Sequence, residues 1–156
     1  MSSQNMRIGA MLVAAGKITE AQLEEAVRDQ RDSGKRLGEV LVERGHVSEL
    51  ELTQILSNQL SVAWVALDHV EFSEDILRLV PGKLAREFTL IPVHFRLGEK
   101  GEKILYVAMD DPTNIQAMQR ISEVAVMHVR PMIAPVSEIR RAIETYYPAD
   151  REEFPF

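Results

Sequence analysis

The stretch Arg7–Ile18, RIGAMLVAAGKI, opens a motif that returns 29 positions later as Arg36–Val47, RLGEVLVERGHV. Each copy continues through a leucine to a glutamine, Leu23 and Gln30 in the first and Leu52 and Gln59 in the second. The identity reaches polar positions that an amphipathic pattern alone would leave free to vary. Two copies predict a ligand with two matching halves.

Each copy has the pattern of two helices joined by a turn. Apolar residues at the i, i+3, i+4, i+7 spacing fill the first helix, and Gly16 or Gly45 then supplies the left-handed residue that ends it. Thr19 and Ser48 next open capping boxes of the form S/T-x-x-E/Q. Four short helices are therefore predicted between residues 6 and 60.

The composition changes after Gln59. The patterns predict an extended piece at 62–65, a short helix at 73–79 closed by Pro81 and Gly82, and strands at 90–95 and 103–109 joined by a glycine-containing turn. Asp111 is the predicted N-cap of a helix that runs to residue 124. A third strand at 126–133 and a last helix at 137–146, capped by Ser137, complete the pattern.

These elements predict an α+β fold in two parts. Residues 1–61 would form a helical subdomain of two tandem helix-turn-helix repeats. Residues 62–147 would form a small α/β subdomain with a roughly three-stranded sheet, and residues 148–156 a flexible tail.

Composition limits the classes of function. The chain has 156 residues, 46% of them hydrophobic, which suffices for a normal core, and its lack of cysteine is compatible with a reducing cytoplasm. It begins without a signal-peptide pattern and contains no run of about 20 apolar residues, so we expect a soluble, cytoplasmic protein without membrane insertion. A net charge of -6 argues against binding to duplex nucleic acid.

Arg7 and Arg36 stand where the pattern begins each short helix, a poor place for a cation because free N–H groups and the helix dipole are positive there. A bound phosphate would make this position favourable for an arginine. The arginine, the helix dipole and the amides beside Gly9 or Gly38 would then all attract the phosphate. Arginine also fits the O6/N7 edge of guanine or stacks on the base.

Gln30 and Gln59 occupy the i+7 position of an otherwise apolar stripe, so we expect both to point inward. Their amides would then read a base edge or a backbone group. A purely structural interpretation exists, in which arginine packs over a helix end and glutamine caps a carbonyl. The joint recurrence of arginine, glycine and glutamine favours the ligand interpretation.

The twofold pattern R-[LI]-G-x-x-L-[VI]-x-x-G-x-[IV]-[ST]-x-x-x-L-x-x-x-[LV]-x-x-Q resembles the MshEN-type N-terminal domain of type II secretion and type IV pilus assembly ATPases, a class that binds cyclic di-GMP. The likeness runs from residue 7 to about 147 and includes Asp110–Asn114. It implies one dinucleotide bound across both copies, with Asp111 as a further contact to guanine. The implied ligand-binding residues of the two copies are Arg7, Ile8, Gly9, Leu12, Val13 and Gln30, and Arg36, Leu37, Gly38, Leu41, Val42 and Gln59.

No enzyme is predicted. The sequence contains no G-x-x-x-x-G-K-[ST], so the motor domain that follows in the resembled ATPases is not among these residues. His46, His69, His94 and His128 lack metal-ligand spacing. No nucleophile with an acid/base pair and no Ser-His-Asp arrangement stands out, so we expect neither a catalytic residue nor a metal or cofactor.

Two functions remain open from the sequence. The first is a cyclic di-GMP receptor that regulates a secretion, pilus or motility system. The second is a ligand-free module whose apolar helical surface docks on a secretion or pilus component. The downstream partner, the oligomeric state, and whether the chain is a free-standing receptor or part of a larger protein are not specified by the sequence.

Overall fold

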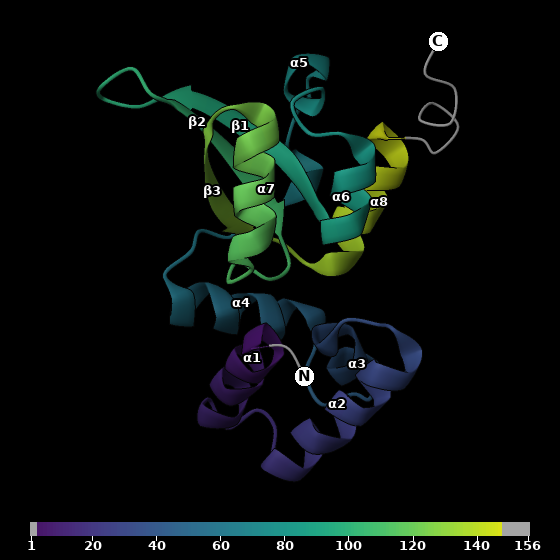
Figure 1. Ribbon diagram of the computed structural model, residues 1–156. Coiled ribbons are helices and arrows are strands. Elements are labelled where there is room, and N and C mark those ends of the chain that lie inside the picture. Colours follow the sequence, from purple (N-terminus) through teal and green to yellow (C-terminus); the bar gives the residue numbers. More distant parts are fainter. Residues whose placement is uncertain (1–2, 148–156) are drawn as a thin grey trace. The chain divides into compact units, whose positions relative to one another are not determined.

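A computed structural model of the chain describes residues 3–147, with side chains from Ile8 onward (Figure 1). The chain forms two compact units, Met1–Val62 and Ala63–Phe156. Within the described residues the fold is α+β, as predicted, with eight α-helices and a three-stranded mixed sheet. The predicted tail at 148–156 lies outside these residues.

The first unit contains only helices, one pair from each sequence copy. The first copy forms α1 (Ser3–Ala14) and α2 (Glu20–Ser33), and the second forms α3 (Leu37–Glu43) and α4 (Glu49–Leu60). Gly16 and Gly45 follow α1 and α3 with φ of 74° and 76°, in the left-handed region that glycine adopts without strain. The four predicted helices are therefore confirmed.

Both predicted capping boxes are complete. The Thr19 hydroxyl accepts from the Gln22 N–H at 3.1 Å, and the Gln22 side chain accepts from the Thr19 N–H at 2.9 Å. Ser48 and Glu51 repeat this exchange, at 3.1 Å in each direction. These bonds satisfy N–H groups that have no partner inside α2 and α4, and thereby fix where each helix begins.

The repeated glycines have a packing role in this unit. A Cβ placed on Gly9 would lie 2.5 Å from Leu23 Cδ1, and one on Gly38 would lie 2.8 Å from Leu52 Cδ2. Each glycine therefore lets the first helix of its copy approach the leucine of the second helix. The repeated glycine and the repeated leucine of the motif are thus two sides of one contact.

The stability of the helical unit depends on pH through the lowered pKa of Glu51. A hydrogen bond from Lys17 Nζ (2.6 Å), together with the bonds from Ser48, lowers the pKa of Glu51 from 4.5 to about 2. A depressed carboxylate pKa stabilises the fold above the unfolded value of 4.5, and this contribution is lost as the pH falls to about 2.

We expect Glu51→Gln to lower the thermal midpoint at neutral pH, and the difference from the unmodified chain to disappear near pH 2. The glutamine keeps a side-chain oxygen for the capping box, as Gln22 does in the first copy, but cannot pair with Lys17 as an anion. Circular dichroism melts between pH 7 and pH 2 measure this. Glu24→Gln, on the exposed face of α2, is the control, and a constant difference across this pH range would contradict the assignment.

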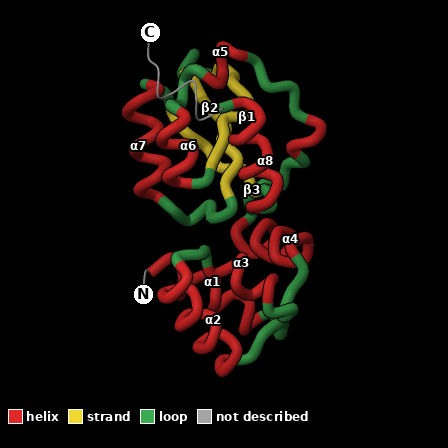
Figure 2. Tube along the Cα trace, turned by 90° about the vertical axis from the view of Figure 1, so that its right-hand side faces the viewer, coloured by secondary structure: helices red, strands yellow, loops and turns green. Residues whose placement is uncertain are grey.

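The second unit is built on one sheet (Figure 2). Strands β1 (Leu90–Leu97) and β2 (Lys103–Met109) form an antiparallel hairpin, and β3 (His128–Ile133) pairs in parallel with β2, in the order β1-β2-β3. Helix α7 (Ile115–Ala125) joins β2 to β3 and packs along β3. The 3-10 helix η1 (Leu67–His69) packs on α8 (Val136–Tyr146), and α5 (Glu74–Leu77), α6 (Gly82–Phe88) and α8 pack against β1.

Apolar side chains from both the strands and the helices form the core of this unit. The central strand β2 contributes Leu105 and Val107, which are fully buried, and Ile121 of α7 and Ile139 of α8 are equally inaccessible. Within residues 3–147, none of the helices has the length and apolar character needed to cross a membrane.

Three local expectations in this unit were wrong. Pro81 and Gly82 begin helix α6 rather than ending a helix, because proline is tolerated at a helix start and Leu84 and Ala85 supply a buried face. Pro135, with φ of −60°, occupies the N-cap of α8, so Ser137 lies inside the first turn and is not the cap.

Asp111 is the third correction. Its Oδ1 accepts from the Thr113 N–H (2.9 Å) and hydroxyl (2.5 Å), which closes a local turn. The helix starts later, and its N-cap is Asn114, whose Oδ1 accepts from the Ala117 N–H at 3.1 Å. An aspartate that bonds the backbone two residues ahead favours a turn over a helix start.

Candidate functional site

The two arginines of the motif occupy different backbone positions. Arg36 is the N-cap of α3, with φ −76° and ψ 150°, and is half-buried. Its backbone N–H donates to Glu39 Oε1 at 3.1 Å. Arg7 lies inside α1, which already begins at Ser3, so the expectation that both arginines begin a helix was wrong for Arg7. The Arg7 side chain lies outside the described residues.

This difference removes part of the predicted anion site. The N–H group of Gly9 lies beyond the first turn of α1, where backbone N–H groups bond within the helix rather than to a ligand. At α3 the Glu39 carboxylate accepts from the N-cap backbone and adds a negative charge. The phosphate interpretation therefore relies on the arginine side chains more than on free backbone amides.

The two glutamines also differ. Gln30 is half-buried near the end of α2, and its backbone carbonyl accepts from the Gly34 N–H at 3.0 Å. Gln59 is exposed at the end of α4, so the expectation that it points inward was wrong. The buried face of α4 is centred on Thr53 and Leu56 rather than on Leu52, and position 59 falls outside it.

Four of the six apolar positions assigned to the ligand belong to the core of the helical unit. Their exposed fractions are 8% for Ile8, 0% for Leu12, 2% for Leu37 and 0% for Leu41. Val13 and Val42, which correspond in the two copies, are only half-buried. Of the six, these two valines are the side chains that the structure leaves open to a bound molecule.

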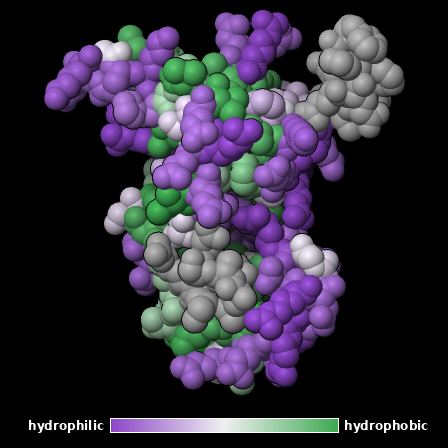
Figure 3. Space-filling model, viewed as in Figure 1, coloured by the Kyte–Doolittle hydropathy of each residue, from purple (hydrophilic) through white to green (hydrophobic). Residues whose placement is uncertain are grey.

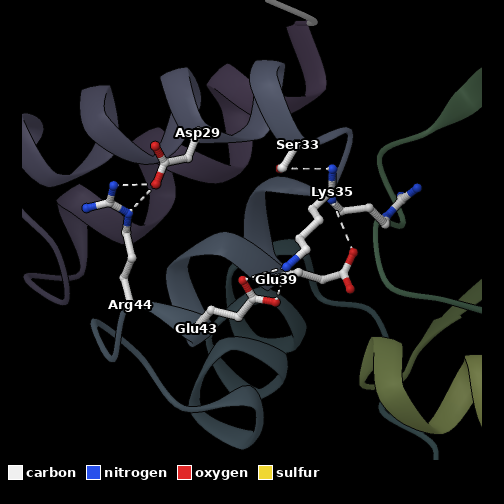
Figure 4. A network of polar contacts seen from close by, with 7 residues as sticks. Asp29, Ser33, Lys35, Glu39, Glu43 and Arg44 are labelled. Atoms are coloured by element: carbon white, nitrogen blue, oxygen red, sulfur yellow. Dashed lines mark hydrogen bonds and ion pairs between the residues drawn. The ribbon is translucent and has the colours of Figure 1, made fainter.

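Charges that the motif does not contain gather around the second copy (Figure 4). Arg44 donates from Nε to Asp29 Oδ2 at 2.7 Å, and from Nη1 to Glu25 at 3.2 Å. Lys35 donates to Glu43 at 2.8 Å, a bond that raises the pKa of Lys35. A cavity of about 290 Å³ lies beside these residues, between the end of α2 and α3.

The repeated motif does not include these residues, because they do not recur in the two copies. The first-copy positions that correspond to Lys35 and Arg44 are Met6 and Ala15. The two copies thus share the residues of the motif and differ in the charges beside it. Arg44, from the second copy, pairs with Asp29 of the first and so joins the two repeats.

The remaining predicted residue, Asp111, lies in the second unit. Asp111 is buried, with an exposed fraction of 6%, and its Oδ1 is engaged by Thr113. Its contact with a ligand stays a prediction from the resemblance. Among residues 3–147, no group of histidine, aspartate or glutamate side chains has the arrangement of a metal site.

Comparison with known proteins identifies the family. The model of the MshEN domain matches residues 60–153, more than half of the chain. The chain belongs to the MshEN family. The family model matches the second unit, whereas the tandem motif lies in the first unit. The sequence resemblance rested mainly on the tandem motif, so the family model matches the other part of the chain.

Two curated relatives extend the likeness across both units of this MshEN domain. The type IV pilus assembly ATPase PilB of Myxococcus xanthus is 36% identical over 141 residues, which cover 90% of this chain and 24% of the relative. PilB of Thermus thermophilus is 30% identical over 142 residues, covering 91% and 16%. This MshEN domain therefore spans less than a quarter of the relatives' length.

Solved structures show the same fold. The structure of MshE with cdg has a TM-score of 0.67 and 30% identity, and covers 90% of this chain and 98% of the other. The N-terminal domain of XpsE has a TM-score of 0.70 at 21% identity, covering 94% and 98%, and shares the fold.

Proposed function

We propose that this MshEN domain binds one molecule of cyclic di-GMP across its two sequence copies, and that binding regulates a secretion, pilus or motility machine. The observation that carries the proposal is the recurrence of arginine, glycine and glutamine at matching positions of two helix pairs. MshE, which is 30% identical and was solved with cdg (cyclic di-GMP), supports it.

The structure of the helical unit refines which side chains would hold the ligand. Arg36 sits at the start of α3 rather than within a helix and is half-buried, so its guanidinium can reach a guanine edge or a phosphate while its stem packs on the protein. Val13 and Val42 offer apolar contact to bases or sugars. The buried apolar residues of the motif would contribute indirectly, by holding in place the helices that carry these groups. These residues are Ile8, Leu12, Leu37 and Leu41.

A ligand-free docking module is the alternative. The repeated glycines and four of the repeated apolar residues already have a packing role, which they would keep without any dinucleotide. Gln59, by contrast, is exposed and has no such packing role, and the two arginines recur together with it. Their recurrence at matching positions favours the receptor over the docking module.

Isothermal titration calorimetry of the full chain with cyclic di-GMP tests the proposal. We expect one ligand per chain, and an affinity for cyclic di-AMP at least about tenfold weaker. Adenine presents an N6 donor where guanine presents O6, so an arginine fork loses one bond and meets a repulsive group. Absence of binding would favour the docking module, and equal affinity for both dinucleotides would reject the guanine assignment.

A further inference from the structure

A groove runs along α7 in the second unit, beside β3 and the start of β2. Its wider part, about 500 Å³, is lined on the helix side by Ile115 and Met118. Its narrower part, about 380 Å³, reaches Val126. The two parts share Glu102, Ser122 and His128 and therefore adjoin one another. Figure 3 shows hydrophobic atoms among hydrophilic ones on the face that carries α7.

Exposed apolar side chains stand at both ends of this groove. Ile115 is 57% exposed and Val126 is 80% exposed. Val126 also ends α7 with φ of 58°, a left-handed conformation that a β-branched residue adopts only at a cost. Glycine or asparagine would end the helix more easily. Packing inside the unit does not account for a valine here, because most of its side chain is in solvent.

Arg130 lines the strand side of the groove, and Arg96 lies on the same face of the sheet, on β1. Tyr106 on β2 lies opposite His94 on β1 and Arg130 on β3, and Arg96 and His128 occupy the next row of the same face. Arg96 lies over the Tyr106 ring, 5.5 Å from its centroid. In the part of the chain that the structure describes, neither Arg96 nor Arg130 forms an ion pair. These cations stand out on a chain whose net charge is -6.

The free edge of β3 is poorly suited to adding another strand. Ile133 donates its N–H to Ala63 at 2.8 Å and accepts from Val65 at 2.9 Å, so its backbone polar groups point away from β2. Alternate residues of a strand share this direction, which makes Pro131 the next residue along the edge. Proline has no N–H to donate. A partner would therefore be recognised by side chains in the groove rather than by strand pairing.

We propose that this groove docks a segment of another protein that carries acidic side chains between apolar ones. The apolar side chains would cover Ile115, Met118 and Val126, and the acidic ones would face Arg96 and Arg130. One acidic side chain, Glu102, lines both parts of the groove, together with the basic side chains Lys103 and Arg130. The groove is lined by residues of the second unit alone, so docking there does not depend on dinucleotide binding.

Two synthetic ten-residue peptides test the proposal by NMR titration of the full chain, one alternating leucine with glutamate and the other leucine with lysine. We expect the acidic peptide to shift the amide signals of Ile115, Met118, Val126, His128 and Arg130, and to bind at least about tenfold more tightly than the basic one. Arg130→Glu should weaken binding of the acidic peptide by a similar factor. Arg78→Glu, an exposed arginine at the end of α5, should not change it.

Several outcomes would overturn the proposal. These are no saturable shift at about 1 mM acidic peptide, shifts confined to other residues, equal affinity for both peptides, or indifference to Arg130→Glu. Shifts at the same residues that appear on raising the protein concentration without peptide would identify a second copy as the occupant instead. Failure of cyclic di-GMP to bind would leave the peptide result unchanged, so the two proposals fail separately.

Discussion

Replacing Leu41 by alanine should lower the free energy of unfolding of the helical unit by about 2–5 kcal/mol. Leu41 has an exposed fraction of 0% and belongs to the core that the four helices share. Truncation removes buried methyl groups and leaves a cavity that the neighbouring helices can only partly fill. Chemical denaturation of the full chain, followed by the helical circular dichroism signal, measures the loss.

Val42→Ala is the matched control, since it alters the next residue, which is half-buried. It should cost less stability than Leu41→Ala and should reduce cyclic di-GMP affinity more directly, because Val42 is open to solvent. A Leu41→Ala variant that kept full stability but lost ligand binding would assign Leu41 to the ligand and contradict its role in the core.

Arg36→Ala and Arg7→Ala should each weaken cyclic di-GMP binding by about 1.5–3 kcal/mol, or about 10- to 150-fold in the dissociation constant. Each substitution removes hydrogen bonds to a charged group from one half of a ligand that spans both copies. Calorimetry with the single variants measures the loss and should return one ligand per chain for the unmodified protein.

The double variant and a distant arginine complete this experiment. The losses from the two arginines should fail to add if release of one half already frees the other. Arg140→Ala, at an exposed position of helix α8 in the second unit, should change affinity little. Two ligands per chain, or full binding by a folded Arg36→Ala variant, would reject the bridging model.

Local sequence signals predicted much of the fold. Gly16 and Gly45 end helices with positive φ, and Thr19 and Ser48 cap the next helices, because these features depend on residues within a few positions of one another. The strand at 103–109 was predicted with the bounds that the structure has. A glycine-containing turn beside it sufficed to predict the hairpin with β1.

The misses occurred where two local signals competed. Asp111 and Asn114 are both good N-caps, and the turn that Asp111 closes with Thr113 left the cap to Asn114. Pro81 suits the end of one helix and the start of another equally well, and the buried contacts of Leu84 and Ala85 decided for a start. Where these helices begin depends on which side chains become buried in the core. Burial depends on residues far away in the sequence, so a short segment does not determine it.

The candidate site shows the same division. The repeat in the sequence determined which positions of the two copies correspond, because correspondence is a property of spacing alone. Tertiary structure decided what each position does. Packing of helix on helix placed Leu12 and Leu41 in the core, left Val13 and Val42 partly open, and set the repeated glycines against Leu23 and Leu52. Burial is a property of how the four helices pack together, so two identical motifs could not reveal that Gln59 is exposed while Gln30 is half-buried.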